Sequence, residues 1–172
     1  MLQIVKPSRL SFLEFSSILD TTILEIHQKE LMDVSHMRYS RQKKIQHSPE
    51  TILDYITKIN DLGGKFYFVK RLSDGSILGT ITIKPNDIES ADIGILIYKR
   101  FSNLGFGSEA FYLVQIILIQ LGFKLMCAGT LIDHFAMRRV FEKTGMKITA
   151  SRNFLNGKFV EKDKVYFEVK LV

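Results

Sequence analysis

The sequence contains one cysteine and no long uninterrupted hydrophobic run, and each absence excludes a class of protein. A single cysteine, Cys127, cannot form a disulfide framework or a zinc site built on several cysteines. It lies in the apolar run 124–128, so we expect a small buried side chain. Residues 1–7 lack the apolar core of a signal peptide, and the longest apolar stretch, 111–123, contains two glutamines and is too short to span a bilayer. We therefore expect a cytoplasmic protein with no metal site and no membrane partner.

The length, hydrophobic content and net charge of the chain indicate one domain with an anionic partner. With 172 residues, 46% of them hydrophobic, the chain can bury one sizeable core, so we expect a single domain spanning 1–172. The formal net charge of +6 favours an anionic partner, and nucleic acid, anionic lipid and a phosphorylated cofactor all satisfy that condition. The net charge therefore favours an anionic partner but does not indicate which of these three it is.

Hydrophobic periodicity predicts an α+β fold with the order β-α-α-β-β-β-α-β-α-β-β. We expect a first strand at 2–5, then helices at 12–31 and 48–62, the second begun by Ser48 as its N-cap. Strands joined by short turns, at 65–70, 77–83 and 92–97, should form an antiparallel meander. The remaining predicted elements are helices at 107–121 and 133–144 and strands at 124–129, 146–154 and 165–172, with Asn156 and Gly157 in the last connection.

The stretch from Asp92 to Leu121 carries the strongest functional signal. A strand that we expect to be buried on both faces, 92–97, leads into a turn containing Gly105 and Gly107, and a helix follows at once. Glycine permits positive φ and close approach of a ligand, and the first N–H groups of a helix point outward with the positive end of its dipole. The turn therefore predicts an anion site, most naturally for a phosphate.

The same turn satisfies the dinucleotide fingerprint G-x-G-x-x-G/A, but its context differs from a Rossmann unit. Seven residues separate Ile97 from Gly105, meander strands come first, and only one crossover follows. We therefore do not expect a dinucleotide site.

Two segments in the second half of the chain resemble the GNAT acetyltransferases. The strand 92–97 followed by Leu104-Gly105-Phe106-Gly107-Ser108-Glu109-Ala110 is similar to their acetyl-coenzyme A motif, R/Q-x-x-G-x-G/A. The segment 139–146 resembles their second signature, a helix ending in E-K-x-G-F, and 154–166 resembles the branch containing the ribosomal-protein N-terminal acetyltransferases. The resemblance implies a mixed, mostly antiparallel sheet with helices on both faces and acetyl-CoA as cosubstrate.

The resemblance also implies which residues form the site. A strand bulge, expected at 95–97, would present backbone donors to the pantetheine arm and the acetyl carbonyl, and Asp92 or Glu89 could act as general base, with Asp92 taken as the catalytic residue. The expected cofactor-binding residues are Ile95, Leu96, Ile97, Ser102, Asn103, Leu104, Gly105, Phe106, Gly107, Ser108 and His134.

The sequence departs from the family pattern at several positions. Ser102 and Asn103 stand where the family carries Arg or Gln and then Gly, and Lys99 or Arg100 could supply the missing charge. His134 replaces an asparagine that touches the cofactor. Phe141 takes the place of a tyrosine that protonates the departing thiolate, and a phenyl ring cannot donate a proton.

The segment 36–47 is basic and contains one tyrosine. It could be a solvated linker, a nucleic-acid face or part of the acceptor site, and we assign Arg38 and Tyr39 to substrate binding without expecting nucleic acid as the partner.

We therefore expect a monomeric or homodimeric N-acetyltransferase that acts on a small-molecule or peptide amine. The acceptor is either a protein N-terminus or a nucleotide-linked amino sugar. Phe141 and Ser102 favour an alternative, a non-catalytic acetyl-CoA-binding or regulatory domain.

Overall fold

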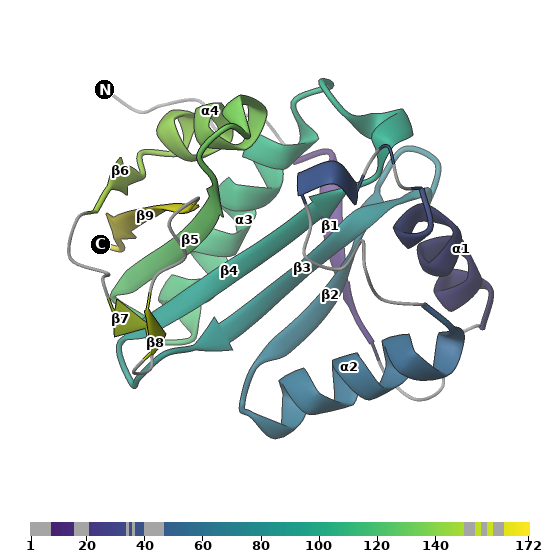
Figure 1. The fold of residues 1–172 in the computed structure, drawn as a ribbon, viewed down its shortest axis with the longest axis horizontal. Coiled ribbons are helices and arrows are strands. Elements are labelled where there is room, and N and C mark those ends of the chain that lie inside the picture. The colour runs from purple at the N-terminus through teal and green to yellow at the C-terminus, as the bar shows by residue number, and fades with distance from the viewer. Residues whose placement is uncertain are drawn as a thin grey trace.

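The computed structural model describes residues 8–15, 21–33, 35, 37–39, 47–149, 154–155, 158–159 and 164–172. Within these ranges the chain forms a seven-stranded sheet of order β1-β2-β3-β4-β5-β9-β6 (Figure 1). Neighbouring strands are antiparallel except β4 and β5, which run parallel. The strands are β1 (Leu10–Glu14), β2 (Lys65–Arg71), β3 (Ile77–Pro85), β4 (Ser90–Ile97), β5 (Leu125–Leu131), β6 (Lys147–Ile148) and β9 (Lys164–Lys170), while β7 (Phe154–Leu155) and β8 (Lys158–Phe159) form a separate pair.

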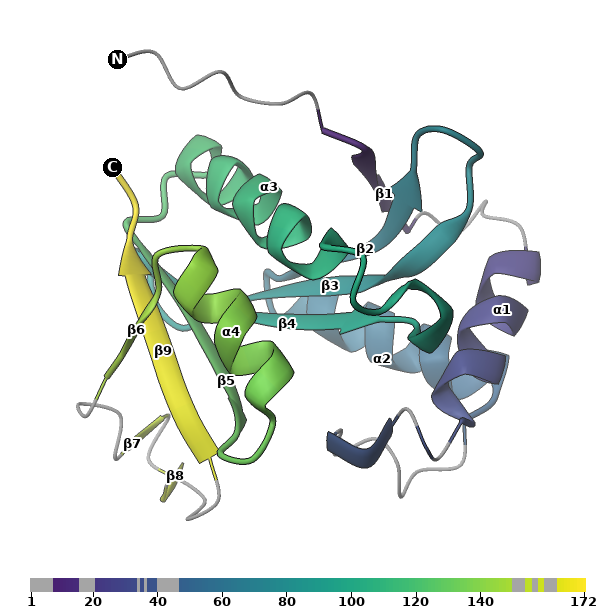
Figure 2. The same cartoon turned by 90° about the horizontal axis from the view of Figure 1, so that it is seen from above.

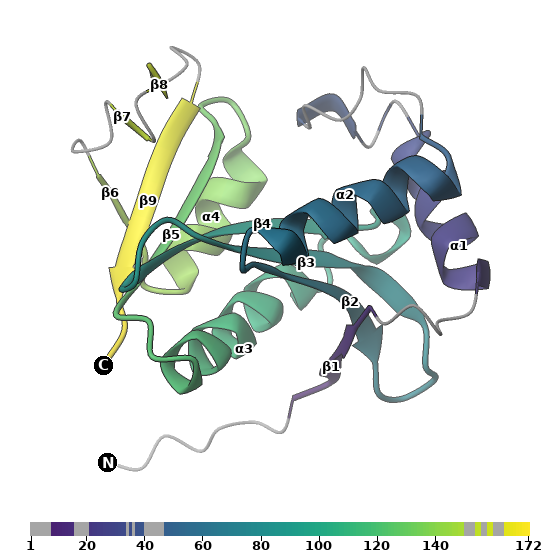
Figure 3. The same ribbon diagram turned by 90° about the horizontal axis from the view of Figure 1, so that it is seen from below.

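Helices cover both faces of the sheet. The helices α1 (Thr21–Leu31) and α2 (Pro49–Asp61) lie on one face, and α3 (Phe106–Gln120) and α4 (Phe135–Lys143) lie on the other (Figures 2 and 3). Two short 3-10 helices, η1 (Met37–Tyr39) and η3 (Lys99–Phe101), lie in connections. No helix in the described ranges is long and apolar enough to cross a membrane.

Each face of the sheet has its own hydrophobic core. On the α3/α4 face the core is formed by residues from β3, β4, β5 and β9 together with those helices, including Ile81, Ile93, Phe111, Met126 and Phe167. On the α1/α2 face it includes Leu24, Ile56, Phe66, Phe68 and Tyr98. The sheet is therefore buried on both sides over β2 and β3, as expected for strands rich in branched and aromatic residues.

The second helix begins as its sequence predicts. The Ser48 side chain accepts a hydrogen bond from the Thr51 amide, and the Thr51 hydroxyl accepts one from the Ser48 amide, which makes a reciprocal capping box. Pro49 occupies the first turn, where no amide donor is needed. Gly63, with φ of +74°, follows the helix end.

The predicted α+β class and the mostly antiparallel sheet are confirmed, but the helix predicted at 12–31 is wrong at its start. Leu10–Glu14 is a strand that pairs antiparallel with β2, and α1 begins only at Thr21. Phe12 packs on the α3/α4 core while Leu13 packs on the α1/α2 core, so alternate residues serve opposite faces. A short apolar run fits both periodicities, and only pairing with β2 decides between them.

Three other predictions fall wholly or partly on residues outside the described ranges. The strand predicted at 2–5 and the Asn156-Gly157 turn lie there. Of the strand predicted at 146–154, the described part contains Lys147–Ile148 as β6 and Phe154 as the first residue of β7.

Candidate functional site

The two parallel strands at the centre of the sheet separate partway along their length. β4 and β5 pair only at Ser90↔Leu125, Ala91↔Met126 and Asp92↔Cys127, although β4 continues to Ile97 and β5 to Leu131. Figure 1 shows the two strands diverging from the lower left of the view. Edge amides and carbonyls that lose a strand partner are available to a ligand. The separation therefore creates a backbone-lined opening between 93–97 and 128–131.

The glycine turn lies at the end of β4, beside this opening. Gly105 has φ of +82° and is the N-cap of α3, and Asn103 also has a positive φ, +61°. The first amides of a helix have no intrahelical acceptor, and the N-cap Gly105 has no side chain that could supply one. A Cβ added at Gly107 would lie 3.5 Å from Val140 Cγ2 and 4.0 Å from Ile97 Cγ1, so this glycine lies where α3, α4 and β4 meet.

A second helix begins at the same edge of the sheet. His134 is the N-cap of α4, and its Nδ1 lies 3.1 Å from the Thr130 hydroxyl. The Tyr39 ring stacks on the imidazole with centroids 4.1 Å apart and an interplanar angle of 8°. The structure thus brings together a residue predicted for the acceptor and one predicted for the cofactor. Arg38 lies in η1 beside Tyr39, but its side chain is outside the described part of the chain.

The α1/α2 face of the sheet is open at the separation. Ala91 and Ile93 belong to the core under α3, so the alternating Asp92 and Gly94 face the other way. Gly94 and Gly129 are both exposed, although each lies within a central strand. A Cβ at Gly94 would come within 2.5 Å of Thr82 Oγ1. Because both glycines lack a side chain and are exposed, the described residues leave an accessible area on this face beside the separation, which we call the open area.

Asp92 lies in the last paired row before the strands separate. Its neighbours across β3 and β5 are Lys84 and Cys127, and Glu168 of β9 faces Cys127 from the far side. The Lys84 ammonium lies 5.5 Å from the centre of the Tyr55 ring on α2. Asp92 is half-buried and Cys127 is fully buried, as the sequence predicted for the thiol.

Four further residues lie around the open area and were not predicted from the sequence: Thr82, Gly129, Tyr166 and Glu168. The Tyr166 ring lies beside Gly129, where an added Cβ would lie 2.9 Å from the ring. Gly129 pairs with Tyr166, and Cys127 pairs with Glu168, between β5 and β9. These residues share a face only through the pairing register, and no local sequence motif marks them.

The structure corrects four details of the predicted site. The register of β3 with β4 is continuous from Gly79↔Ile97 to Pro85↔Ala91, so the bulge expected at 95–97 is absent from this pairing. The separation from β5 exposes the strand edge instead. The latter half of β4 is only partly buried, so burial on both faces holds for the strand's first residues alone.

The other two corrections concern charged groups. Lys99 lies 2.7 Å from Ser35 Oγ and 4.0 Å from Asp33, and Arg100 pairs with Glu30 at 3.3 Å, so both basic residues face the end of α1 and not the glycine turn. Glu89 is exposed and paired with Lys124, in the connection before β4. These surroundings favour Asp92 over Glu89 as the candidate base.

Phe141 lies in the core and not at the opening. It is 2% exposed, and its ring lies 5.3 Å from that of Phe111 and 4.9 Å from that of Phe167. The described part of the chain has no group of three or more His, Cys, Asp or Glu placed to hold a metal ion.

Comparison with solved structures identifies the same architecture in enzymes. Spermidine N-acetyltransferase from Vibrio cholerae, solved with CoA and spermine, superposes with a TM-score of 0.74 at 13% identity, covering 95% of this chain and 96% of that one. RimL, a ribosomal-protein alpha-N-acetyltransferase solved with coenzyme A, gives 0.72 at 12% identity, covering 97% and 96%. A microcin self-immunity acetyltransferase in complex with acetyl-CoA and AMP gives 0.72 at 13% identity, covering 96% and 98%.

At these identities the likeness shows the fold alone, and family membership rests on the sequence. A search of curated protein sequences finds no match. Residues 12–147, however, match the acetyltransferase (GNAT) domain family, and this range includes β4, the glycine turn and both helix starts at the opening. The chain therefore belongs to the GNAT acetyltransferase family.

Proposed function

We propose that the protein transfers the acetyl group of acetyl-CoA to a primary amine by direct attack on the thioester. The observation that carries the proposal is the separation of β4 from β5 immediately before the glycine turn. An opening lined by backbone groups suits the amide-rich pantetheine arm, and uncapped helix amides suit a diphosphate. Structural neighbours solved with CoA or acetyl-CoA support the assignment.

Different residues of the chain would bind the cosubstrate and admit the acceptor amine. The amides from Ser102 to Ser108 would hold the diphosphate at the start of α3, and the edge of Ile95 to Ile97 would orient the acetyl carbonyl. His134 and the stacked Tyr39 border the same edge of the sheet. Acetyl-CoA supplies the activated acetyl group, and the acceptor amine would approach from the α1/α2 face.

Asp92 is our proposed general base. An ammonium must lose a proton before it can attack, and Asp92 is the carboxylate of β4 that faces the open area. Asp92→Asn should lower turnover about 100-fold or more while leaving CoA affinity nearly unchanged, because the amide cannot take up the proton. Steady-state kinetics and calorimetric titration with CoA measure the two quantities.

Glu89→Gln is the matched control for this prediction. It removes a carboxylate only three positions away, but one that is exposed and paired with Lys124. We expect this variant to retain wild-type turnover. Full activity in Asp92→Asn would remove Asp92 from the mechanism.

The acceptor is a protein N-terminal amine or a nucleotide-linked amino sugar. Neighbours named for a polyamine, a ribosomal protein and a microcin act on different acceptors, so the fold does not select one. A panel containing N-terminal peptides, amino-sugar nucleotides and polyamines, with release of thiol as the readout, tests the choice. Thermal stabilisation by CoA without turnover of any amine would support the non-catalytic alternative, and no stabilisation would refute both.

A further inference from the structure

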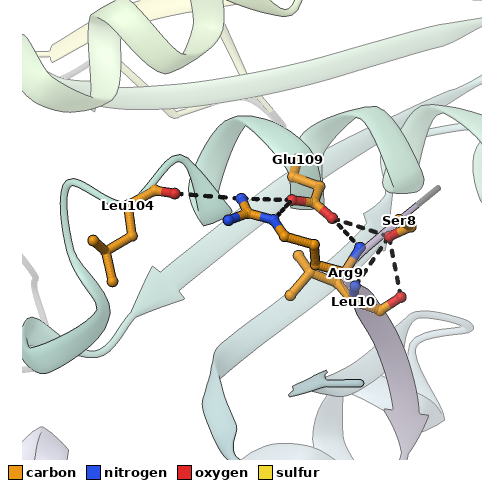
Figure 4. A network of polar contacts seen from close by, with 5 residues as sticks. All are labelled: Ser8, Arg9, Leu10, Leu104 and Glu109. Carbon is orange, nitrogen blue, oxygen red and sulfur yellow. Dashed lines mark hydrogen bonds and ion pairs between the residues drawn. The ribbon is translucent and has the colours of Figure 1, made fainter. Parts of the chain in front are cut away.

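Arg9 reaches from the start of β1 to the first turn of α3, 100 residues away along the chain (Figure 4). Its Nε and Nη2 atoms both lie 2.8 Å from Glu109 Oε2. The same Nη2 lies 3.3 Å from the carbonyl oxygen of Leu104, in the glycine turn. The guanidinium carbon is also 4.3 Å from the centre of the Phe106 ring. The Arg9 side chain therefore contacts Leu104, Phe106 and Glu109, which lie in the glycine turn and the first turn of α3.

The Glu109 carboxylate is held from two further directions. Its Oε1 accepts hydrogen bonds from the Arg9 amide at 2.5 Å and from the Ser8 hydroxyl at 3.2 Å. A carboxylate in the first turn of a helix is favoured by the helix dipole, but it would repel a diphosphate bound to the same turn. Arg9 neutralises that charge, so the turn remains attractive to an anion.

The contact with Leu104 determines where the next amide points. The described chain has no cis peptide bond, and in a planar trans peptide the carbonyl and the following N–H point in opposite directions. Because the Leu104 carbonyl points toward Arg9, the Gly105 N–H points away from it. Gly107 lies against Val140 of α4, whereas Glu109, two positions further along the helix, lies against Arg9.

We propose that Arg9 is a positioning residue for the diphosphate site. By holding the Leu104 carbonyl on the β1 side, it turns the Gly105 amide toward the cofactor side of the loop. The proposal rests on the proposed function of this turn. It also accounts for Ser102 at the position where the family resemblance leads one to expect Arg or Gln: a guanidinium from another strand orients the loop.

The experiment separates positioning from simple ion pairing. Arg9→Met removes every contact of the guanidinium, and we expect CoA binding to weaken about tenfold, the effect of misplacing one hydrogen bond to a charged group. The double variant Arg9→Glu/Glu109→Arg restores an ion pair but offers no donor at position 9 to the Leu104 carbonyl. It should regain the thermal midpoint lost in Arg9→Met without regaining CoA affinity.

A spectroscopic measurement reports on the amide itself. In ¹⁵N-labelled wild-type protein, CoA should move the Gly105 amide proton downfield, and this shift should be lost in Arg9→Met. Arg9→Lys, which keeps a positive charge beside Glu109, is the substitute if Arg9→Met does not fold, and it should weaken CoA binding in the same direction. The control is Lys65→Met, which breaks the comparably exposed Lys65–Glu14 pair of 2.6 Å between β1 and β2 and should leave CoA affinity unchanged.

The possible outcomes are distinct. If the wild-type protein binds CoA and the Arg9 variants bind it equally well, or if the charge-swapped protein regains full affinity, the positioning role is overturned while the proposed function stands. If the wild-type protein does not bind CoA, the proposed function fails first.

Discussion

At the scale of single residues, the clearest titration concerns His27, which is buried between α1 and the sheet. Its Nδ1 lies 2.8 Å from the Tyr98 hydroxyl, and both side chains are almost fully buried. Burial, and secondarily the electrostatic interaction with His47, lowers the pKa of His27 to about 3, and burial raises the pKa of Tyr98 above its usual value. Neutral His27 and the Tyr98 hydroxyl therefore share a buried hydrogen bond, which ties α1 to the residue that follows β4.

This pair predicts a stability change with pH. Because the folded pKa of about 3 lies below the ordinary value of 6.5, the stabilisation is complete above about pH 6.5 and falls as the pH decreases toward 3. Between pH 6.5 and 4.5 the loss should be about 2–3 kcal/mol. His27→Gln keeps a hydrogen-bond acceptor but does not titrate, so urea unfolding at several pH values should give a shallower slope. Equal slopes in the two proteins would contradict the assignment.

At the scale of elements, the start of α3 makes a separate prediction. The N-cap of α3, Gly105, has a positive φ. Two positions later, Gly107 lies close to Val140 of α4 and Ile97 of β4. A Cβ at Gly107 meets its neighbours at ordinary contact distances, so a larger side chain can be accommodated by the fold but would cover the first-turn amides. Gly107→Val should therefore stay folded and bind CoA at least tenfold more weakly, as measured by calorimetry.

Gln120→Val tests whether the effect belongs to the turn. It places the same β-branched residue at the exposed last position of the same helix. Helix propensity changes by only a few tenths of a kcal/mol in either variant, because valine is slightly more favourable in a helix than glycine and slightly less favourable than glutamine. CoA affinity should be unchanged in this variant, and unchanged affinity in Gly107→Val would place the diphosphate elsewhere.

At the scale of the whole molecule, a bound cosubstrate should change the solvent protection of the strand edges where β4 and β5 separate. Strand edges without a partner exchange their amide hydrogens readily, whereas paired edges are protected. Adding CoA should slow hydrogen exchange in peptides covering 93–97 and 128–131, as read by mass spectrometry. Peptides covering β2, which is paired on both sides, should show no change. Protection confined to the helices would argue against binding between the strands.

Parts of this protein could be predicted from short stretches of sequence. Ser48 and Pro49 mark the start of α2, and Gly105 marks the start of α3, because caps and turns depend on residues within one or two turns of chain. The resemblance of 92–110 and 139–146 to the GNAT motifs led to the family for the same reason. The segment 10–14 was predicted wrongly, because its conformation depends on pairing with β2.

Patterns of neighbouring residues were enough to predict the family, the glycine turn and the order of most elements. Packing between distant segments is what places Tyr39 on His134, Arg9 against Glu109, and Asp92 and Glu168 on one face around Cys127. These contacts join residues far apart in the chain. Strand register and core packing produce them, and no local pattern contains that information.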